Sequence, residues 1–291
     1  MNQGHYFAIG AFGIWGLITI FWNQFGEIAA PELLAHRVIW CFLFVSSLLF
    51  YRKGLAWITK LVSQPKVIGW LTLSSILIGI NWFLFIWAVT NEHIVETSLG
   101  YFINPLVKML LGAVLFKETL SKPQWAAVGI VAIAVSFLTY SHGSLPWIAL
   151  TLAMSFALYG AIRKTVEIGA SEGVAFENFV FVPVAIGYLI WLSSNGGNNF
   201  GIDQPQITFL MVLSGLITAV PLILFAKAAR LIPLSTVGII QFLAPSIQLV
   251  VGVTLYNEPF KQVEMIGFGL IWLAVAIYML DAVRRRETLP A

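Results

Sequence analysis

The stretch that decides the fold is residues 207–226, ITFLMVLSGLITAVPLILFA, which contains no charged side chain. A helix of about 20 mainly apolar residues is long enough to cross the hydrocarbon core of a bilayer. The whole chain shares this character, because 59% of its 291 residues are hydrophobic and 10% are charged. A soluble domain has about 25% charged residues, so the composition excludes an ordinary soluble fold and predicts an integral membrane protein.

Apolar segments of similar length recur along the whole chain. Short connectors rich in Gly, Pro, Asn and charged residues separate them. The sequence therefore predicts an all-α membrane protein with ten transmembrane helices. The predicted spans are residues 4–22, 32–50, 66–90, 96–116, 123–139, 145–162, 173–193, 207–226, 233–255 and 262–281.

The basic residues are distributed unequally between the two sets of connectors. With the N-terminus inside, the cytoplasmic connectors and the C-terminal tail hold most of the 16 Lys and Arg residues, whereas the outer connectors hold Lys261. Arg37 and Lys108 fall within spans. The positive-inside rule then predicts a multi-pass protein of the cytoplasmic (inner) membrane with both termini in the cytoplasm. Because the basic residues form no patch, we expect no nucleic-acid partner.

An internal repeat emerges when the chain is shifted against itself by 140 residues, which aligns EIAAPELLA (27–35) with EIGASEGVA (167–175). Each half then holds five predicted spans, an odd number, so the second half must cross the membrane in the opposite sense. We therefore predict two inverted five-helix repeats, residues 1–141 and residues 142–291, the second with the basic tail. The alternative is a duplicated bundle that serves as a channel or scaffold. The same shift pairs Ala88, Pro105, Gly112, Glu118 and Gly129 with Ala228, Pro245, Gly252, Glu258 and Gly269.

A set of short motifs is spread over both halves of the chain. They are ELLAHR (32–37), NW (81–82), LGYFINPL (99–106), TAVPL (218–222), PLSTVG (233–238), Gln241, AP (244–245) and EP (258–259). Their order and spacing resemble the EamA-type branch of the drug/metabolite transporter superfamily, and within it the chloramphenicol-sensitive (RarD-like) permeases. The resemblance covers nearly the whole chain. It implies an inner-membrane permease with two EamA-like repeats, and it suggests export as the direction of transport.

A polar stripe follows one face of the fourth predicted span. Tyr101, Asn104 and Lys108 are three and four residues apart, so they share one side of the helix. The 140-residue shift places Gln241 and Gln248 of the ninth predicted span at the positions of Tyr101 and Lys108. Two symmetry-related spans thus carry polar stripes, and we expect both to line a substrate site near the midplane.

Lys108 is the strongest candidate for substrate binding. A charged side chain within the bilayer costs at least about 2.5 to 3.5 kcal/mol, so we expect Lys108 to bind an anionic or carbonyl group of the substrate. The alternative is that it extends to the cytoplasm or bonds backbone carbonyls beside Pro105. Asn81 from the NW motif is a further candidate. Trp15 and Tyr159 each precede a glycine and are candidate aromatic walls, although lipid-facing aromatics also fit.

Charged residues near helix ends suggest two gates. His36 and Arg37 open the second predicted span, and the shift pairs Arg37 with Glu177. Because inversion places these two near opposite membrane surfaces, we expect no direct ion pair between them. The candidate partners are Glu32, Glu92 and Glu96 for Arg37, and Lys227, Arg230 and Arg163 for Glu177. The alternative is that these charges only anchor helix ends. Bends at Pro105, Pro221 and Pro245 would allow such gates to move.

Missing motifs narrow the function. The chain has no GxxxxGK[ST] segment for direct use of ATP, no HExxH or GxSxG motif, and four scattered histidines. We expect no cofactor, no metal and no enzymatic activity. The sequence predicts a secondary transporter of small organic metabolites or drugs that works by alternating access; the alternative is a membrane-embedded enzyme or a non-transporting helical subunit. The expected partners are a small-molecule substrate and the lipid bilayer. A homodimer, the substrate and the coupling ion are left open.

Overall fold

The computed structural model of the chain describes residues 3–117, 119–232, 237 and 240–287. Within these ranges every regular element is an α-helix, and no strand occurs. The helices in chain order are α1 (Gln3–Asn23), α2 (Ala30–Lys53), α3 (Ala56–Val62), α4 (Pro65–Thr90), α5 (Ile94–Phe116), α6 (Lys122–His142), α7 (Trp147–Thr165), α8 (Ala170–Ser194), α9 (Pro205–Leu231), α11 (Leu243–Thr254) and α12 (Gln262–Glu287).

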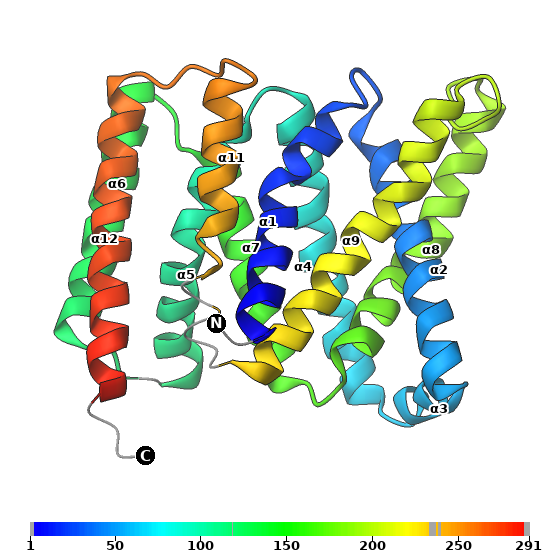
Figure 1. Cartoon of the computed structure of the whole chain (residues 1–291), viewed down its shortest axis with the longest axis horizontal. Helices are drawn as coiled ribbons and strands as arrows, with labels where there is room; N and C mark the ends of the chain where they lie inside the picture. The colour runs from blue at the N-terminus through cyan, green and yellow to red at the C-terminus, as the bar shows by residue number, and fades with distance from the viewer. Residues whose placement is uncertain (1–2, 118, 233–236, 238–239, 288–291) are drawn as a thin grey trace.

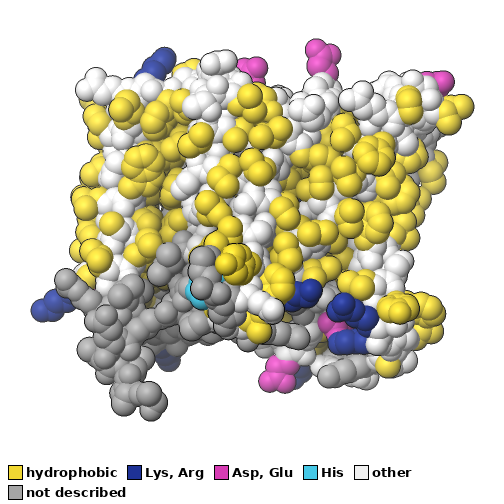
Figure 2. Space-filling model, in the orientation of Figure 1, with side chains coloured by type: hydrophobic (Ala, Val, Ile, Leu, Met, Phe, Trp, Pro, Cys, Tyr) yellow, Lys and Arg dark blue, Asp and Glu magenta, His cyan; other side chains and the backbone are white. Residues whose placement is uncertain are grey.

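Most helices run side by side between two ends of the bundle (Figure 1). Helix α3, the start of α1 and the end of α12 lie at one end, which also carries Arg52, Lys53 and Lys66. We call this the basic end and the opposite one the far end. Hydrophobic side chains cover the band between the two ends (Figure 2). Eight helices are long and apolar enough to cross a membrane, so the chain is a multi-pass membrane protein.

Two of the ten predicted spans differ from the helices. The prediction for 145–162 corresponds to α7, whose apolar part, Trp147–Arg163, is shorter than a typical span. The prediction of one continuous helix over 233–255 is not matched, because α11 begins at Leu243, and residues 233–236 and 238–239 lie outside the described residues. Pro245 explains this start, since the first turn of a helix is where a missing backbone N–H costs least. Helix α3 occupies the connector between the second and third predicted spans.

The helices pack in a pattern of pairs. Helix α5 packs on α7 and α11, α4 on α7 and α8, α1 on α9 and α11, and α2 on α8 and α9, while α6 packs on α12. The 140-residue shift exchanges α1 with α7, α2 with α8, α4 with α9, α5 with α11, and α6 with α12. Applying that exchange turns the pair α5–α7 into α11–α1 and the pair α4–α7 into α9–α1. It leaves α2–α8, α5–α11 and α6–α12 unchanged.

Glycines set the closest helix contacts. A Cβ atom added to Gly100 of α5 would lie 2.7 Å from the Ala149 carbonyl oxygen of α7. One added to Gly215 of α9 would lie 2.5 Å from the backbone nitrogen of Cys41 in α2. Because these neighbours are backbone atoms that cannot turn aside, both positions require glycine. Helix α5 is therefore held tightly on α7, and α9 on α2.

Glu258, in the connector after α11, fixes the start of α5. Its two carboxylate oxygens accept hydrogen bonds from the backbone N–H groups of Ile94 and Val95, each at 2.7 Å. These donors belong to the first turn of α5, which has no partner for them within the helix. Burial raises the pKa of the Glu258 carboxyl, and the two N–H donors act in the opposite direction. The carboxylate thus links the two halves of the chain at the far end.

Candidate functional site

A polar and aromatic cluster lies between α4, α5 and α7. The Asn81 side-chain amide donates to the Leu152 carbonyl oxygen and to Ser155 Oγ, each at 3.0 Å, and its oxygen accepts from the Tyr101 hydroxyl at 3.3 Å. The Tyr101 ring meets Phe156 edge-on, with centroids 6.2 Å apart. Asn81 is only 1% exposed, so these bonds replace the water that a buried amide would otherwise need. The cluster joins two of the residues predicted to bind substrate, Asn81 and Tyr101.

Lys108 extends onto the same aromatic group. Its ammonium nitrogen lies 4.7 Å from the centre of the Phe156 ring. A Cβ atom on Gly160 would lie 3.6 Å from Lys108 Cε, so the lysine stem runs along α7 at ordinary contact distance from this glycine. Among the residues that the structure describes, Lys108 has no hydrogen bond and no ion pair. A cation–π contact is its one charge-stabilising interaction there.

Glu177 of α8 closes the cluster toward the basic end. Its carboxylate accepts from Ser74 Oγ at 2.8 Å and from the Tyr159 hydroxyl at 3.2 Å, and it lies 3.7 Å from the Arg163 guanidinium. The Tyr159 ring stacks on Phe156 with centroids 5.8 Å apart. A continuous line of contacts therefore runs from Lys108 through the rings of Phe156 and Tyr159 to Glu177. It ends at the ion pair of Glu177 with Arg163.

A glycine makes the ion pair of Arg163 and Glu177 possible. Gly173 lies one helical turn before Glu177 in α8, and the Arg163 guanidinium occupies the space that a Cβ atom there would fill. Arg163 thereby crosses from α7 to α8 while its side chain stays 16% exposed. Of the three cations predicted for Glu177, the structure places Arg163 against it.

Arg37 has a different environment from the predicted one. Its guanidinium carbon lies 4.2 Å from the ring centre of Trp82 and 5.5 Å from that of Trp22, and the residue is 5% exposed. In the described part of the chain it meets none of the three carboxylates proposed as its partners. One of them, Glu32, instead accepts from the backbone N–H and the side-chain amide of Asn199, each at 2.8 Å.

His36 holds the connector after α8. Its ring stacks on Phe200 with centroids 4.6 Å apart and an angle of 20° between the planes. Together with the bonds between Glu32 and Asn199, this contact folds the connector between α8 and α9 onto the first turns of α2 at the far end. His36 is thus covered by this connector.

The remaining predicted substrate contacts are used in helix packing. The Asn104 amide donates to the Ala153 carbonyl oxygen at 2.8 Å and so joins α5 to α7. The Gln248 amide donates to the Trp15 carbonyl oxygen at 3.1 Å and joins α11 to α1, while the Trp15 ring lies against Phe12 and Phe225. Gln241 is half-buried in the turn before α11. In the described part of the chain, neither glutamine forms a side-chain hydrogen bond with the Lys108 cluster.

The prolines divide into two kinds. Pro105 and Pro221 lie inside α5 and α9, where each removes a backbone hydrogen bond. Pro245 instead lies in the first turn of α11, where no helical bond is lost. Pro183 lies inside α8 and was missed by the sequence analysis.

Sequence reasoning also missed Ser74, Trp82 and Phe156 as parts of the cluster. The 140-residue shift pairs Ser74 with Ser214, which is a signal that could have singled it out. Phe156 and Tyr159 are three residues apart in α7, a spacing that stacks two rings on one helix face. Trp82 follows Asn81 directly, and its role depends on where α2 crosses α4.

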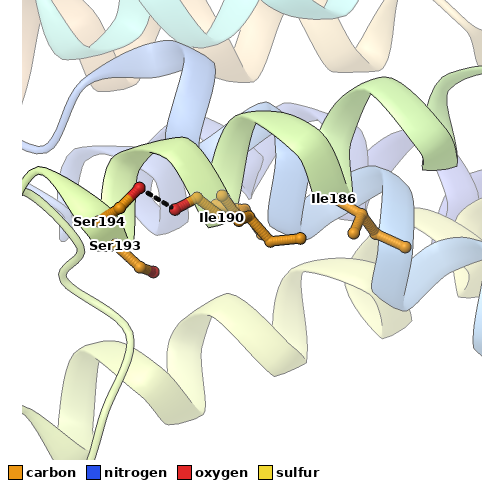
Figure 3. A pocket seen from close by; sticks show the side chains of 5 residues that line it. Ile186, Ile190, Ser193 and Ser194 are labelled. Atoms are coloured by element: carbon orange, nitrogen blue, oxygen red, sulfur yellow. Dashed lines mark hydrogen bonds between the residues drawn. The ribbon is translucent and has the colours of Figure 1, made fainter.

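A shallow hollow on α8 is separate from this cluster. It is lined by Ile186, Leu189, Ile190, Ser193 and Ser194 (Figure 3). The Ser194 hydroxyl donates to the Ile190 carbonyl oxygen at 2.8 Å, so it is already used within the helix. No charged side chain lines the hollow, and it offers nothing that would recognise a polar substrate. Within the described residues, no group of three His, Cys, Asp or Glu could hold a metal ion.

Comparisons with known proteins decide the family. A model described as the EamA-like transporter family matches residues 2–140. Protein RarD of Streptomyces exfoliatus is 41% identical over 97% of this chain and 90% of its own length. The uncharacterized transporter YojE of Bacillus subtilis is 39% identical over 97% of this chain and 95% of its own length. The chain belongs to the EamA family of RarD-like permeases.

EamA membership makes the chain a membrane transporter of the drug/metabolite type, and it confirms the resemblance drawn from the sequence motifs. A solved structure described as "Crystal structure of protein" has a TM-score of 0.61 to this chain at 14% identity, covering 96% of this chain and 98% of that one. At that identity the likeness shows the fold alone. The shared fold accounts for the helices around the cluster, and the chemistry of the cluster depends on this chain's own residues.

Proposed function

We propose that this EamA-family chain is a secondary transporter of small organic metabolites or drugs. By alternating access, its substrate site opens first to one side of the cytoplasmic membrane and then to the other. The observation that carries the proposal is the line of contacts from the half-buried Lys108 through Phe156 and Tyr159 to the buried Glu177. A cation and a carboxylate are expensive to keep at membrane depth, and such groups generally mark a substrate or ion pathway. The basic end faces the cytoplasm in this proposal, and export is the proposed direction.

The depth of this cluster supports a site near the midplane. Helix α5 begins at the far end, and Lys108 lies about 20 Å along it at 1.5 Å per residue. Glu177 lies about 10 Å from the basic-end start of α8 on the same scale. In a hydrocarbon core about 30 Å thick, both side chains fall in its middle part, where transporters with inverted repeats hold their substrates.

The pattern of helix pairs supports two inverted repeats, residues 1–141 and 142–291. Exchanging each helix with the one 140 residues away turns the main packing pairs, α5–α7, α4–α7 and α2–α9, into the observed pairs α1–α11, α1–α9 and α4–α8. Glu32 and Glu172, which the same shift pairs, each bind the segment at the end of the other helix of the α2–α8 pair: Glu32 binds Asn199, and Glu172 binds Lys53. The proposed movement is a rocking of one repeat against the other about the pseudo-twofold axis that would relate them.

Two gates are proposed at the ends of the cluster. The ion pair of Arg163 with Glu177 is the gate toward the basic end. Arg37 and His36, covered by the connector after α8, form the gate toward the far end. Pro105 and Pro221, inside α5 and α9, are the proposed bending points.

The test is transport by purified full-length protein in liposomes, with a panel of metabolites and drugs and with or without a pH gradient. We expect flux of a subset of the panel, reduced about 5- to 30-fold in Lys108→Ala, since losing a cation–π contact costs about 1 to 2 kcal/mol. Lys66→Ala is the matched control, because Lys66 is an exposed lysine at the start of α4. Dependence on the gradient would identify proton coupling.

The possible results separate the two parts of this proposal. Flux that Lys108→Ala leaves unchanged would remove Lys108 from the substrate site and keep the transporter. If the wild-type protein moves no compound of the panel, the transporter itself is contradicted for those substrates, and a non-transporting role takes its place.

A further inference from the structure

Arg37 is a buried cation that meets no acidic side chain among the residues described. Its side chain belongs to α2, and its guanidinium lies over the faces of Trp82 from α4 and Trp22 from α1. The residue is 5% exposed. Over the residues described by the structure, the guanidinium makes neither an ion pair nor a hydrogen bond. A guanidinium has five N–H donors in a planar fork, so a large capacity for binding is left unused here.

In the described part of the chain, two buried side-chain donors at Arg37 have no hydrogen-bond partner. Arg37 Nε and Trp22 Nε1 are both enclosed, and neither has a hydrogen-bond partner among the described residues. Trp22 is fully buried. Native structures pair nearly all buried polar groups, and an exception calls for an explanation such as a missing ligand. Two adjacent unpaired donors, one of them cationic, match a ligand group rich in acceptor oxygens.

The arginine lies next to the buried cluster. Trp82, which it covers, directly follows Asn81, and the Asn81 side chain binds the Tyr101 hydroxyl. Arg37 is about 10 Å along α2 from its far-end start, and Tyr101 is about 10 Å along α5 from its own far-end start. The two side chains therefore occupy the same level of the bundle, on the far-end side of Lys108.

The charges of the cluster are unbalanced. Glu177 has Arg163 as its partner, while Arg37 and Lys108 each rest on aromatic rings. Of the membrane-buried charges in this part of the described chain, two cations are thus left without a carboxylate. A substrate that carries its own negative charge would balance them, whereas a cationic substrate would be repelled.

We propose that the substrates are organic anions whose carboxylate or phosphate group binds the Arg37 guanidinium between Trp22 and Trp82. This inference rests on the proposed function, since it names the substrate class of the same site. The fork of Arg37 matches two acid oxygens, and Trp22 Nε1 adds a third donor. The apolar or aromatic part of the substrate extends toward Tyr101 and Phe156. The far-end gate then closes on the substrate's acid group instead of on a carboxylate of the chain.

The test measures the binding of small aromatic probes to the full-length protein in detergent. Quenching of tryptophan fluorescence reports the binding. Benzoate and phenyl phosphate carry the two acid groups, and benzamide is the neutral match. We expect saturable quenching by at least one of the two anions and none by benzamide. Arg37→Gln should weaken anion binding about 10- to 100-fold, the usual effect of losing a charged hydrogen bond. Arg52→Gln, an exposed arginine on the same helix, should leave it unchanged.

Each result decides the inference. Equal binding of benzamide, retention of anion binding by Arg37→Gln, or no binding of either anion would overturn it. If Arg37→Gln does not fold, Arg37→Lys keeps the charge and loses the fork, and unchanged anion affinity in that variant overturns the inference as well. The relative affinities of benzoate and phenyl phosphate separate carboxylate from phosphate recognition. Anion binding without flux in liposomes would sustain the anion site at Arg37 and contradict the transporter, whereas flux of neutral compounds alone would sustain the transporter and contradict the anion site.

Discussion

The two ends of the α2–α8 pair are built on matching positions and held by different chemistry. Glu32 begins α2 at the far end, and Glu172 begins α8 at the basic end, 140 residues later. Glu32 binds the two amide groups of Asn199, whereas Glu172 binds the ammonium of Lys53. One turn further along, Arg37 rests on tryptophans and Glu177 pairs with Arg163.

This difference shows that a repeat can conserve position while changing charge. At the basic end, two carboxylates of α8 are neutralised by cations of the chain, Lys53 and Arg163. At the far end, the carboxylate of Glu32 is satisfied by neutral amides, and the cation of Arg37 keeps its donors free of acid partners in the described residues. The basic end can close by itself, and the far end is the one left for a ligand under our proposal.

Removing the buried cation at the basic end should have the largest effect on stability. Arg163→Gln leaves the Glu177 carboxylate, which is 1% exposed, without its cation. We expect a loss of about 3 kcal/mol, because breaking a buried ion pair leaves one charge uncompensated. Thermal unfolding of the purified protein measures the change. Removing both charges in Arg163→Gln with Glu177→Gln should restore part of the loss, and a double variant no more stable than Arg163→Gln would contradict the pairing.

The far-end carboxylate should come second. Glu32→Ala removes the acceptor of two amide bonds, and we expect a loss of about 2 kcal/mol, the usual size for hydrogen bonds to a charged group. Asn199→Ala removes one of the two bonds and should cost about half as much. Both variants should speed chymotrypsin cleavage after Phe200, and Glu32→Ala should do so more, since it removes both bonds to the connector whereas Asn199→Ala removes one. Unchanged cleavage in both would show that Glu32 does not hold the connector.

The pair of Lys53 and Glu172 should matter least. The Lys53 side chain is 55% exposed, and exposed ion pairs contribute at most about 1 kcal/mol. Lys53→Gln should therefore change the melting temperature little, and the small change should vanish in high salt as screening increases. A loss as large as that of Glu32→Ala would mean that charge and amide contacts hold the two ends equally, which would remove the contrast between them.

Much of the fold follows from the sequence because of one simple rule: a helix that crosses the lipid needs about 20 mainly apolar residues. Eight predicted spans, among them 66–90 and 207–226, correspond to helices long and apolar enough to cross a membrane. The rule fails at α11, where Pro245 fits the first turn of a helix better than its interior. Length and hydropathy do not say where in an apolar run a helix begins, and this depends on the backbone partners that a proline gives up.

The sequence shows only in part how the candidate site residues are arranged, for a related reason. Tyr101, Asn104 and Lys108 share a helix face, and spacing alone treats them alike. In the structure, Asn104 is bound to the Ala153 carbonyl, while Tyr101 and Lys108 meet Phe156. The difference arises from how closely α5 approaches α7 at Gly100, which is a property of two helices together. The spacing of residues along one helix does not show how closely a second helix approaches. For the same reason the sequence did not predict which residues contact Arg37.

The tight crossing of α2 and α9 at Gly215 has a consequence for experiments on this protein. Cys41, the single cysteine of the chain, is fully enclosed at that crossing. Because thiol reagents attack an exposed thiolate, alkylation of Cys41 can proceed only when α2 separates from the residues of α8 and α9 that cover the thiol. The alkylation rate of Cys41, measured with and without a bound compound, therefore reports how often these helices separate in the native protein.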